Sequence, residues 1–308
     1  MRCLGTIPVS EDIQVIVVDD NSPDADTYLE KYPMFSRPYL EFVRTTEGKG
    51  AGYARNVGLT HARGRWLLFA DADDFFADGM QDIIFSHADS PADIIYFRKK
   101  NVYSSDVNLK FTDQLYLDSI IEQFKQGDDW PLRTTFYVPY AKMIKRALVE
   151  KWNIRYEEIR YGNDCFFAVC TGCHAETIET SDEVLYVKTQ RDGSLSDSFC
   201  KKTGELEMRA EGAMRLDKFL MQHNMSREKK IKFYLYKMLS HDRPLFVKYY
   251  SHRLGEVYPS RWAAIKDLLT GKSPRYKVRF ILFITLVECS LAVKRLKPLR
   301  REELEVWS

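Results

Sequence analysis

Buried strands and helical segments alternate over the first hundred residues. Short apolar runs without polar alternation are typical of strands that are buried on both faces of a parallel sheet. Four such runs occur, at residues 13–18, 39–43, 66–70 and 94–97. Helix-like spacing of apolar residues fills 50–62 and 83–87 between them. This alternation predicts an α/β fold with a mostly parallel sheet.

Farther along the chain the spacing of apolar residues becomes helical. Three further helices are predicted, over residues 113–125, 140–151 and 163–175. Beyond residue 200 the spacing is helical throughout, with one apolar stripe that starts at Leu206 and another that starts at Ile231. We therefore expect an α/β domain over residues 1–200 and a helical region over residues 201–308, with the boundary near 198–204.

Carboxylates directly follow two of the predicted strands. Asp19 and Asp20 come after the first strand, and Asp71 and Asp73 come after the third. Because open α/β sheets bind ligands at the carboxyl ends of their strands, we expect both clusters to face one crevice. Hard divalent cations in phosphate chemistry bind one or two carboxylates together with substrate phosphates. The same Asp-x-Asp pattern is also common in solvated turns, and Asp74 is a candidate helix cap.

Five segments resemble the family 2 glycosyltransferases, which have a GT-A nucleotide-sugar-binding fold. Three of them follow the family's order: VIVVDDNSPD, GKGAGYARNVGL and GRWLLFADADDFF. Two later segments resemble the family's Gly-Glu-Asp segment and the polar loop that follows it: NIRYEEIRYGNDCFF and KTQRDGSLS. The resemblance covers roughly residues 2–198. It implies a Rossmann-like GT-A sheet flanked by helices, followed by an α-helical C-terminal region.

The resemblance implies a nucleotide site at the carboxyl ends of the strands. The residues that would bind the nucleotide are Asp19, Asp20, Arg55, Asn56 and Asp71. The acidic pair would contact the base and the ribose, and Asp71 would lie near the ribose. Asp73, together with Asp71, matches the family's metal motif and would ligate Mn²⁺ or Mg²⁺.

The resemblance also implies the catalytic group. Asp164 matches the family's carboxylate base, and Arg191 and Ser194 match the loop near the diphosphate and the acceptor. A hydroxyl is a poor nucleophile until a base takes its proton, and a metal offsets the charge that develops on a leaving diphosphate. We therefore expect an inverting, metal-dependent transfer of a sugar from a nucleotide diphosphate sugar, foremost a UDP-sugar, to a glycan or lipid-linked acceptor. The process would be bacterial surface polysaccharide synthesis.

Two departures from the family pattern leave other functions open. Asn163 stands where the family has Glu beside the base. The family's first strand and most of its first helix have no counterpart, and residues 2–7 resemble the end of that helix, which predicts an N-terminally truncated catalytic domain. A catalytically impaired binding or assembly subunit is therefore one alternative. A sugar nucleotidyltransferase is another, although the glycine-rich loop with Arg and Lys that opens such enzymes is not visible.

Charge divides the chain more sharply than its formal net charge of +2 indicates. Residues 1–200 carry 22 basic and 32 acidic side chains, whereas residues 201–308 carry 24 basic and 12 acidic ones. Nine of these basic residues and a single acid, Glu288, lie in the segment 271–301, around an apolar stretch. Such a segment is typical of a helix at an anionic membrane surface, but a helix packed on the catalytic domain fits equally well. We expect no nucleic-acid partner, because no nucleic-acid-binding module is recognisable.

The remaining sequence features bear on location and on cysteine chemistry. No apolar run approaches the roughly 20 residues of a membrane-spanning helix, and no secretory signal opens the chain. We therefore expect a cytoplasmic protein that is peripheral at the inner face of the cell membrane. Cys170 and Cys173 with His174 match a c-type haem attachment pattern, and a redox or zinc site that includes Cys165 is also open. Buried free cysteines are the simpler interpretation.

Overall fold

The computed structural model describes residues 2–103, 115–190 and 204–304. The chain forms two compact units. The first unit comprises Met1–Gly212 and Leu220–Met225, and the second comprises Ala213–Phe219 and Ser226–Ser308. Most of the predicted boundary at 198–204 lies outside the described residues.

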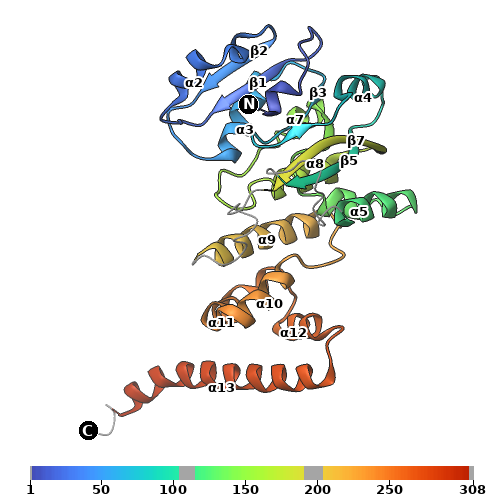
Figure 1. The fold of residues 1–308 in the computed structure, drawn as a ribbon. Coiled ribbons are helices and arrows are strands. Elements are labelled where there is room, and N and C mark those ends of the chain that lie inside the picture. Colours follow the sequence, from blue (N-terminus) through green and yellow to red (C-terminus); the bar gives the residue numbers. More distant parts are fainter. Residues whose placement is uncertain (1, 104–114, 191–203, 305–308) are drawn as a thin grey trace. The chain divides into compact units, whose positions relative to one another are not determined.

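The first unit begins with a short helix and a two-stranded parallel sheet. Helix α1 (Arg2–Gly5) precedes β1 (Val15–Asp19), which pairs in parallel with β2 (Leu40–Arg44). The crossover between these strands contains α2 (Ala25–Lys31) and the 3₁₀ helix η1 (Pro33–Ser36). Helix α3 (Ala51–His61) follows β2 and packs against β1 (Figure 1). This part confirms the predicted strands at 13–18 and 39–43 and the helix at 50–62.

A five-stranded sheet forms the larger part of the first unit. Its strand order is β3-β6-β5-β7-β4. The strands are β3 (Trp66–Leu67), β4 (Phe75–Phe76), β5 (Ile94–Tyr103), β6 (Lys142–Lys145) and β7 (Ile178–Gln190). Among these described strands, β5 and β7 pair in parallel and the other three pairings are antiparallel. The prediction of a mostly parallel sheet is therefore wrong for this sheet, which is mixed.

Errors in two predicted elements explain why the sheet was expected to be mostly parallel. Residues 140–151 are predicted as one helix, but they form β6 followed by the short helix α7 (Arg146–Lys151). Periodicity alone does not separate a short apolar strand from a helical segment. Strand β7 is absent from the prediction altogether. Only the first two residues of the predicted strand at 66–70 join the ladder.

Helices cover this sheet and complete the core. They are α4 (Met80–Ser86), α5 (Leu115–Lys125), α6 (Trp130–Thr135) and α8 (Cys165–His174). The centre of the core is β5, in which Ile94, Ile95, Tyr96 and Phe97 are at most 1% exposed. Burying each such large apolar side chain contributes roughly 1.5–3 kcal/mol to folding. This rigid centre supports the loops at the ends of the strands.

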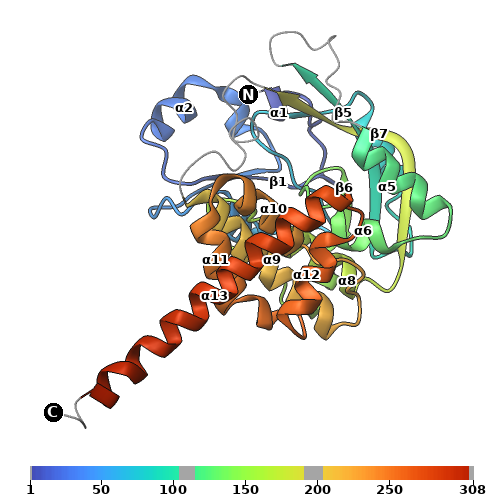
Figure 2. The ribbon, with the colours of Figure 1, turned by 90° about the horizontal axis from the view of Figure 1, so that it is seen from below.

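The second unit is helical. Helix α9 (Glu205–Gln222) contributes residues to both units. The other elements of the second unit are α10 (Ile231–His241), α11 (Arg243–His252), η3 (Leu254–Glu256), α12 (Arg261–Leu269) and α13 (Pro274–Leu304). The C-terminal end of α13 extends beyond the other helices of this unit (Figure 2). The core of the second unit contains Leu235, Met238, Phe246 and Leu268, all fully buried.

Candidate active site

Asp20 fastens the glycine-rich loop that leads into α3. One of its carboxylate oxygens accepts the hydroxyl of Thr45 at 2.8 Å, and the other accepts the backbone N–H of Gly50. Gly50 has a φ of 96°, a conformation that favours glycine. Asp19, next to it, accepts the N–H of Ser22 at 3.0 Å. The predicted acidic pair therefore organises the loops around the carboxyl end of β1, as well as being a candidate for nucleotide contact.

The acidic loop after β3 is held by β7. The Tyr186 hydroxyl accepts the backbone N–H of Asp71 at 2.9 Å and donates to the Asp74 carboxylate at 3.0 Å. Thr189 donates its N–H to Asp74 at 2.7 Å and its hydroxyl to the carbonyl of Asp73 at 2.7 Å. Asp74 is buried, and burial raises its pKa to about 6 in spite of these hydrogen bonds. It does not cap a helix; it connects the loop to the sheet.

Arg55 connects the acidic loop after β3 to the segment that precedes α8. Its Nη2 contacts Oδ1 of Asp71 at 2.6 Å, and its Nη1 donates to Oδ1 of Asn163 at 2.9 Å. The guanidinium also lies over the ring of Tyr156, 5.2 Å from the centroid. Burial lowers the pKa of Arg55, but the charge and hydrogen bond of Asp71, together with Tyr156 and Asp164, outweigh this effect and raise the pKa. The guanidinium is therefore a permanent positive charge between Asp71 and the segment that carries Asp164.

Helix α3 packs unusually closely on that same segment. A Cβ atom at Gly52 would lie 2.1 Å from the carbonyl oxygen of Glu157, so only glycine fits this contact. Asn56 donates to the carbonyl of Tyr156 at 3.0 Å and accepts the N–H of Tyr156 at 2.8 Å. The Gly-x-x-Arg-Asn pattern of α3 thus holds residues 156–163 by backbone approach and by hydrogen bonds.

Asp164 lies at the N-terminus of α8, directly after Asn163. Burial raises the pKa of this carboxyl, and the positive charge of Arg55 opposes that rise. A carboxylate with a raised pKa is a better proton acceptor than an exposed one. Its neighbourhood therefore suits a general base. Asn163 accepts the Arg55 hydrogen bond without adding negative charge beside Asp164.

A buried amine lies in the same core. Lys142 on β6 is 3% exposed, and its Nζ donates to the carbonyl of Phe136 at 2.7 Å. It also lies over the Phe136 ring, 4.9 Å from the centroid. Burial lowers the pKa of Lys142 to about 7, and the negative charge of Asp164 opposes that decrease. Sequence reasoning did not single out this residue.

The acidic loop offers oxygen ligands of the kind that Mn²⁺ and Mg²⁺ prefer. Asp73 is exposed, whereas Asp71 is half-buried and shares one oxygen with Arg55. No group of three or more Asp, Glu, His or Cys side chains among the described residues could hold a metal by itself. Two carboxylates fit a cation whose remaining ligands are substrate phosphates and water. The same finding gives no support to a zinc site at Cys165, Cys170 and Cys173.

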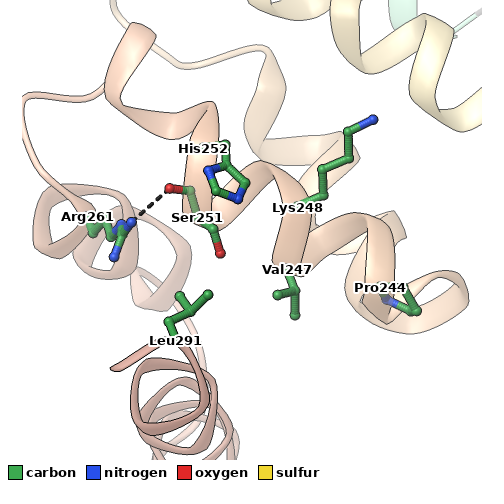
Figure 3. Close-up of a pocket in the computed structure, with 7 residues that line it drawn as sticks. All are labelled: Pro244, Val247, Lys248, Ser251, His252, Arg261 and Leu291. Carbon is green, nitrogen blue, oxygen red and sulfur yellow. Dashed lines mark hydrogen bonds between the residues drawn. The ribbon is translucent and has the colours of Figure 1, made fainter. Parts of the chain in front are cut away.

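Other predicted features lie apart from this cluster. Arg191 and Ser194 are outside the described residues. The cysteine motif lies on α8, where Cys170 is buried, and none of the described cysteines is in a disulfide. In the second unit a pocket of about 470 Å³ is lined by residues of α11 together with Arg261 and Leu291, and it contains none of the predicted site residues (Figure 3).

Comparison with known proteins shows which proteins the chain resembles. Residues 9–152 match the profile of Glycosyl transferase family 2. The matched segment is just under half of the chain, so the chain is similar to this family over residues 9–152. The chain is 28% identical over 196 residues to the uncharacterised glycosyltransferase EpsJ of Bacillus subtilis, covering 60% of this chain and 55% of EpsJ. It is 27% identical over 195 residues to the succinoglycan biosynthesis protein ExoO of Rhizobium meliloti, covering 60% and 54%.

The fold of the chain is similar to that of a solved structure. Staphylococcus aureus TarS, residues 1–349, crystallised with UDP-GlcNAc, superimposes with a TM-score of 0.59 at 20% identity, covering 80% of this chain and 73% of TarS. This likeness confirms the GT-A prediction. The chain spans just over half the length of the curated relatives named above. The match to the family 2 profile and the likeness to glycosyltransferases favour a glycosyltransferase over a sugar nucleotidyltransferase.

Sequence reasoning named several residues of this cluster and missed the residues that support them. The structure brings Asp71 and Arg55 together with Asn163, which precedes Asp164. The shared crevice of Asp19 and Asp20 with Asp71 and Asp73 stays a prediction. Tyr186 and Thr189 were missed because β7 was not predicted. The apolar residues around Tyr186 were the available signal, since they indicate a buried strand.

Proposed function

We propose that this protein is a family 2 glycosyltransferase that transfers a sugar from a nucleotide diphosphate sugar to an acceptor hydroxyl, with inversion at the anomeric carbon. The Arg55 bridge carries this proposal, because one guanidinium joins Asp71, the predicted donor contact, to Asn163 beside the predicted base. Donor recognition and proton removal would therefore occur in one cluster.

The proposed chemistry is a single displacement. Asp164 takes the proton of the acceptor hydroxyl while that oxygen attacks the anomeric carbon. The bond from this carbon to the diphosphate breaks as the glycosidic bond forms, and the nucleoside diphosphate leaves with the electron pair. Attack from the side opposite the leaving group inverts the carbon. A Mn²⁺ or Mg²⁺ ion held by Asp73 with Asp71 would stabilise the negative charge of the diphosphate.

The relatives suggest which substrates to test first. TarS was crystallised with UDP-GlcNAc, and ExoO is named for succinoglycan biosynthesis. These names support a UDP-sugar donor and a glycan or lipid-linked acceptor in bacterial surface polysaccharide synthesis. Such an acceptor would place the protein at the inner face of the cell membrane. No described helix combines the length and the apolar character that crossing a bilayer requires.

The decisive experiment measures turnover of a panel of nucleotide sugars with Mn²⁺, by wild type and by Asp164→Asn. We expect the variant to lose activity by about 10²–10⁴-fold, because it cannot accept the proton. Nucleotide affinity, measured by calorimetry, should change little. Asp89→Asn, an exposed carboxylate elsewhere in the first unit, is the matched control and should keep wild-type activity.

Two results would contradict the proposal. Wild-type turnover by Asp164→Asn would remove this residue from the role of base. Nucleotide binding by the wild type without turnover of any donor would favour the alternative of a binding or assembly subunit with the same fold.

A further inference from the structure

Helix α13 carries apolar side chains on two opposite faces. Phe280, Ile284 and Val287 are at most 8% exposed and form the inner face, which packs into the second unit. The outer face consists of Val278, Ile281, Leu282 and Leu286, which are 46–71% exposed. At 100° per residue these positions lie away from the inner face. The helix therefore packs on the protein, yet leaves a second apolar face uncovered.

The outer face is a continuous strip. Val278, Leu282 and Leu286 follow one another at spacings of four, and Ile281 comes three residues after Val278, which places the four side chains on one side of the helix. Isolated exposed apolar residues are normal on protein surfaces, whereas a contiguous exposed patch indicates an interaction site. The pocket near Leu291 is on the inner face, so it is separate from this strip.

Charge around the outer face is of one sign. Arg275, Lys277 and Arg279 are exposed at the start of the helix. The single acid of the segment 271–301, Glu288, accepts the Tyr250 hydroxyl at 2.7 Å and lies 3.3 Å from Arg261. Glu288 is thus engaged by partners on α11 and α12. Apart from the half-buried Glu288, the exposed side of the helix between residues 274 and 291 presents cations and apolar or uncharged groups, with no other carboxylate.

We propose that the outer face of α13 lies in the plane of an anionic lipid surface. Val278, Ile281, Leu282 and Leu286 would enter the boundary between headgroups and acyl chains, while Arg275, Lys277 and Arg279 contact lipid phosphates. The sequence continues with five basic residues and no acid over residues 294–301. This proposal rests on the proposed function, because lipid contact would give the enzyme access to a membrane-bound acceptor.

A second copy of the chain fits this face less well. Pairing two outer faces would bring two sets of basic residues together, which is unfavourable for like charges. An anionic bilayer instead offers the complementary charge. The observations therefore favour lipid over self-association as the occupant.

The test measures binding of the full chain to vesicles by flotation. Phosphatidylcholine vesicles are compared with vesicles that also contain phosphatidylglycerol, and binding is expected only to the anionic ones. Leu282→Glu combined with Leu286→Glu should weaken that binding at least tenfold. Tyr116→Glu, at a 55% exposed aromatic on α5, is the matched control and should bind like wild type.

A second arm tests the charges. Replacing Arg275, Lys277 and Arg279 by Gln should weaken binding by about fivefold for each residue. Added salt should weaken wild-type binding in the same direction. Circular dichroism and thermal unfolding establish that these exposed substitutions leave the fold intact.

Several outcomes would overturn the proposal. They are absence of binding to anionic vesicles, equal binding by the Leu282 and Leu286 variant, and a dimer in solution that this variant dissociates. Nucleotide binding without vesicles is measured in parallel. Because it depends on the first unit, it reports failure of the proposed function independently of failure of the lipid contact.

Discussion

Arg55 connects residues that are far apart in the sequence. It binds Asp71, 16 positions away, and Asn163, 108 positions away. A planar guanidinium can satisfy two partners in fixed directions, which the compact ammonium of lysine does not reproduce. The side chain therefore positions the acidic loop relative to the segment of Asp164, and its charge acts on the Asp164 carboxyl.

Replacing Arg55 should change the pH dependence of transfer. Burial raises the pKa of Asp164 above 3.8, so activity should fall, as the pH decreases, at a higher pH than for an exposed Asp. Arg55 opposes that rise, so Arg55→Gln should shift this acid limb further upward. We expect kcat/KM to fall by about 10–100-fold, the value of one or two charge-assisted hydrogen bonds. A pH profile of kcat/KM measures both effects.

Arg55→Lys separates charge from geometry. It should shift the acid limb less than Arg55→Gln, because it keeps the positive charge, while it still loses much of the rate. Arg63→Gln, at an exposed arginine in the same unit, is the control. An unchanged acid limb in Arg55→Gln would refute the electrostatic link to Asp164.

At this scale the sequence predicted the acids better than their partners. Asp71 and Asp164 follow recognisable local patterns, a buried strand in one case and a family-like segment in the other. The Tyr186 hydroxyl meets Asp74, 112 positions earlier, only because β7 pairs with β4. Such a contact is a consequence of strand pairing, which apolar periodicity does not specify.

Helix α3 shows how one element transmits order to another. Gly52→Ala would place a Cβ 2.1 Å from the backbone of Glu157, so the segment before Asp164 must move. We expect a loss of about 1–3 kcal/mol in the free energy of unfolding, as for overpacked core sites. Transfer activity should fall as well, because Arg55 and Asn56 hold the same segment. Denaturant unfolding and initial rates measure the two effects.

The same helix supplies the control for that substitution. A Cβ at Gly58 would lie 3.6 Å from Val18, an ordinary contact. Gly58→Ala should therefore be neutral or more stable, since alanine is favoured over glycine inside a helix by roughly 0.5–1 kcal/mol. Equal stability losses at both positions would show that general helix effects, and not the close approach to Glu157, control the result.

Elements were predicted well where the periodic segment was long, and poorly where the segment was short. The eleven residues of α3 and the ten of α8 agree with their predicted ranges to within a few positions. The four residues of β6 were absorbed into a predicted helix, because Met143 and Ile144 fit either period. Such a short run adopts its strand only through pairing with β3 and β5.

For the whole molecule, the split in charge has a structural counterpart. The basic residues of the C-terminal half include those around the outer face of α13, and the acids of the N-terminal half include the cluster around Arg55. The sequence could not choose between a packed and a membrane-bound C-terminal helix. The structure shows packing of one face and exposure of the other, which the linear composition of the segment could not separate.

Global stability should depend on pH through the buried Lys142. Burial lowers the pKa of this amine from 10.5 to about 7 in the folded protein. Between these values the unfolded chain holds a proton that the folded chain has released, so stability rises with pH there, by roughly 1.4 kcal/mol per pH unit. Below about pH 7 both states are protonated, and the cost of the buried charge is fully present.

Lys142→Met should therefore stabilise the first unit most below pH 7, and its advantage should shrink as the pH approaches 10.5. Urea unfolding of wild type and variant across this pH range measures the difference in their free energies of unfolding. The contributions of other titrating groups cancel in this difference. Lys100→Met, at an exposed position on β5, should show no such trend. A constant difference between Lys142→Met and wild type would mean that Lys142 keeps its proton in the fold. Its contacts with the Phe136 carbonyl and ring would then suffice to hold a buried ammonium.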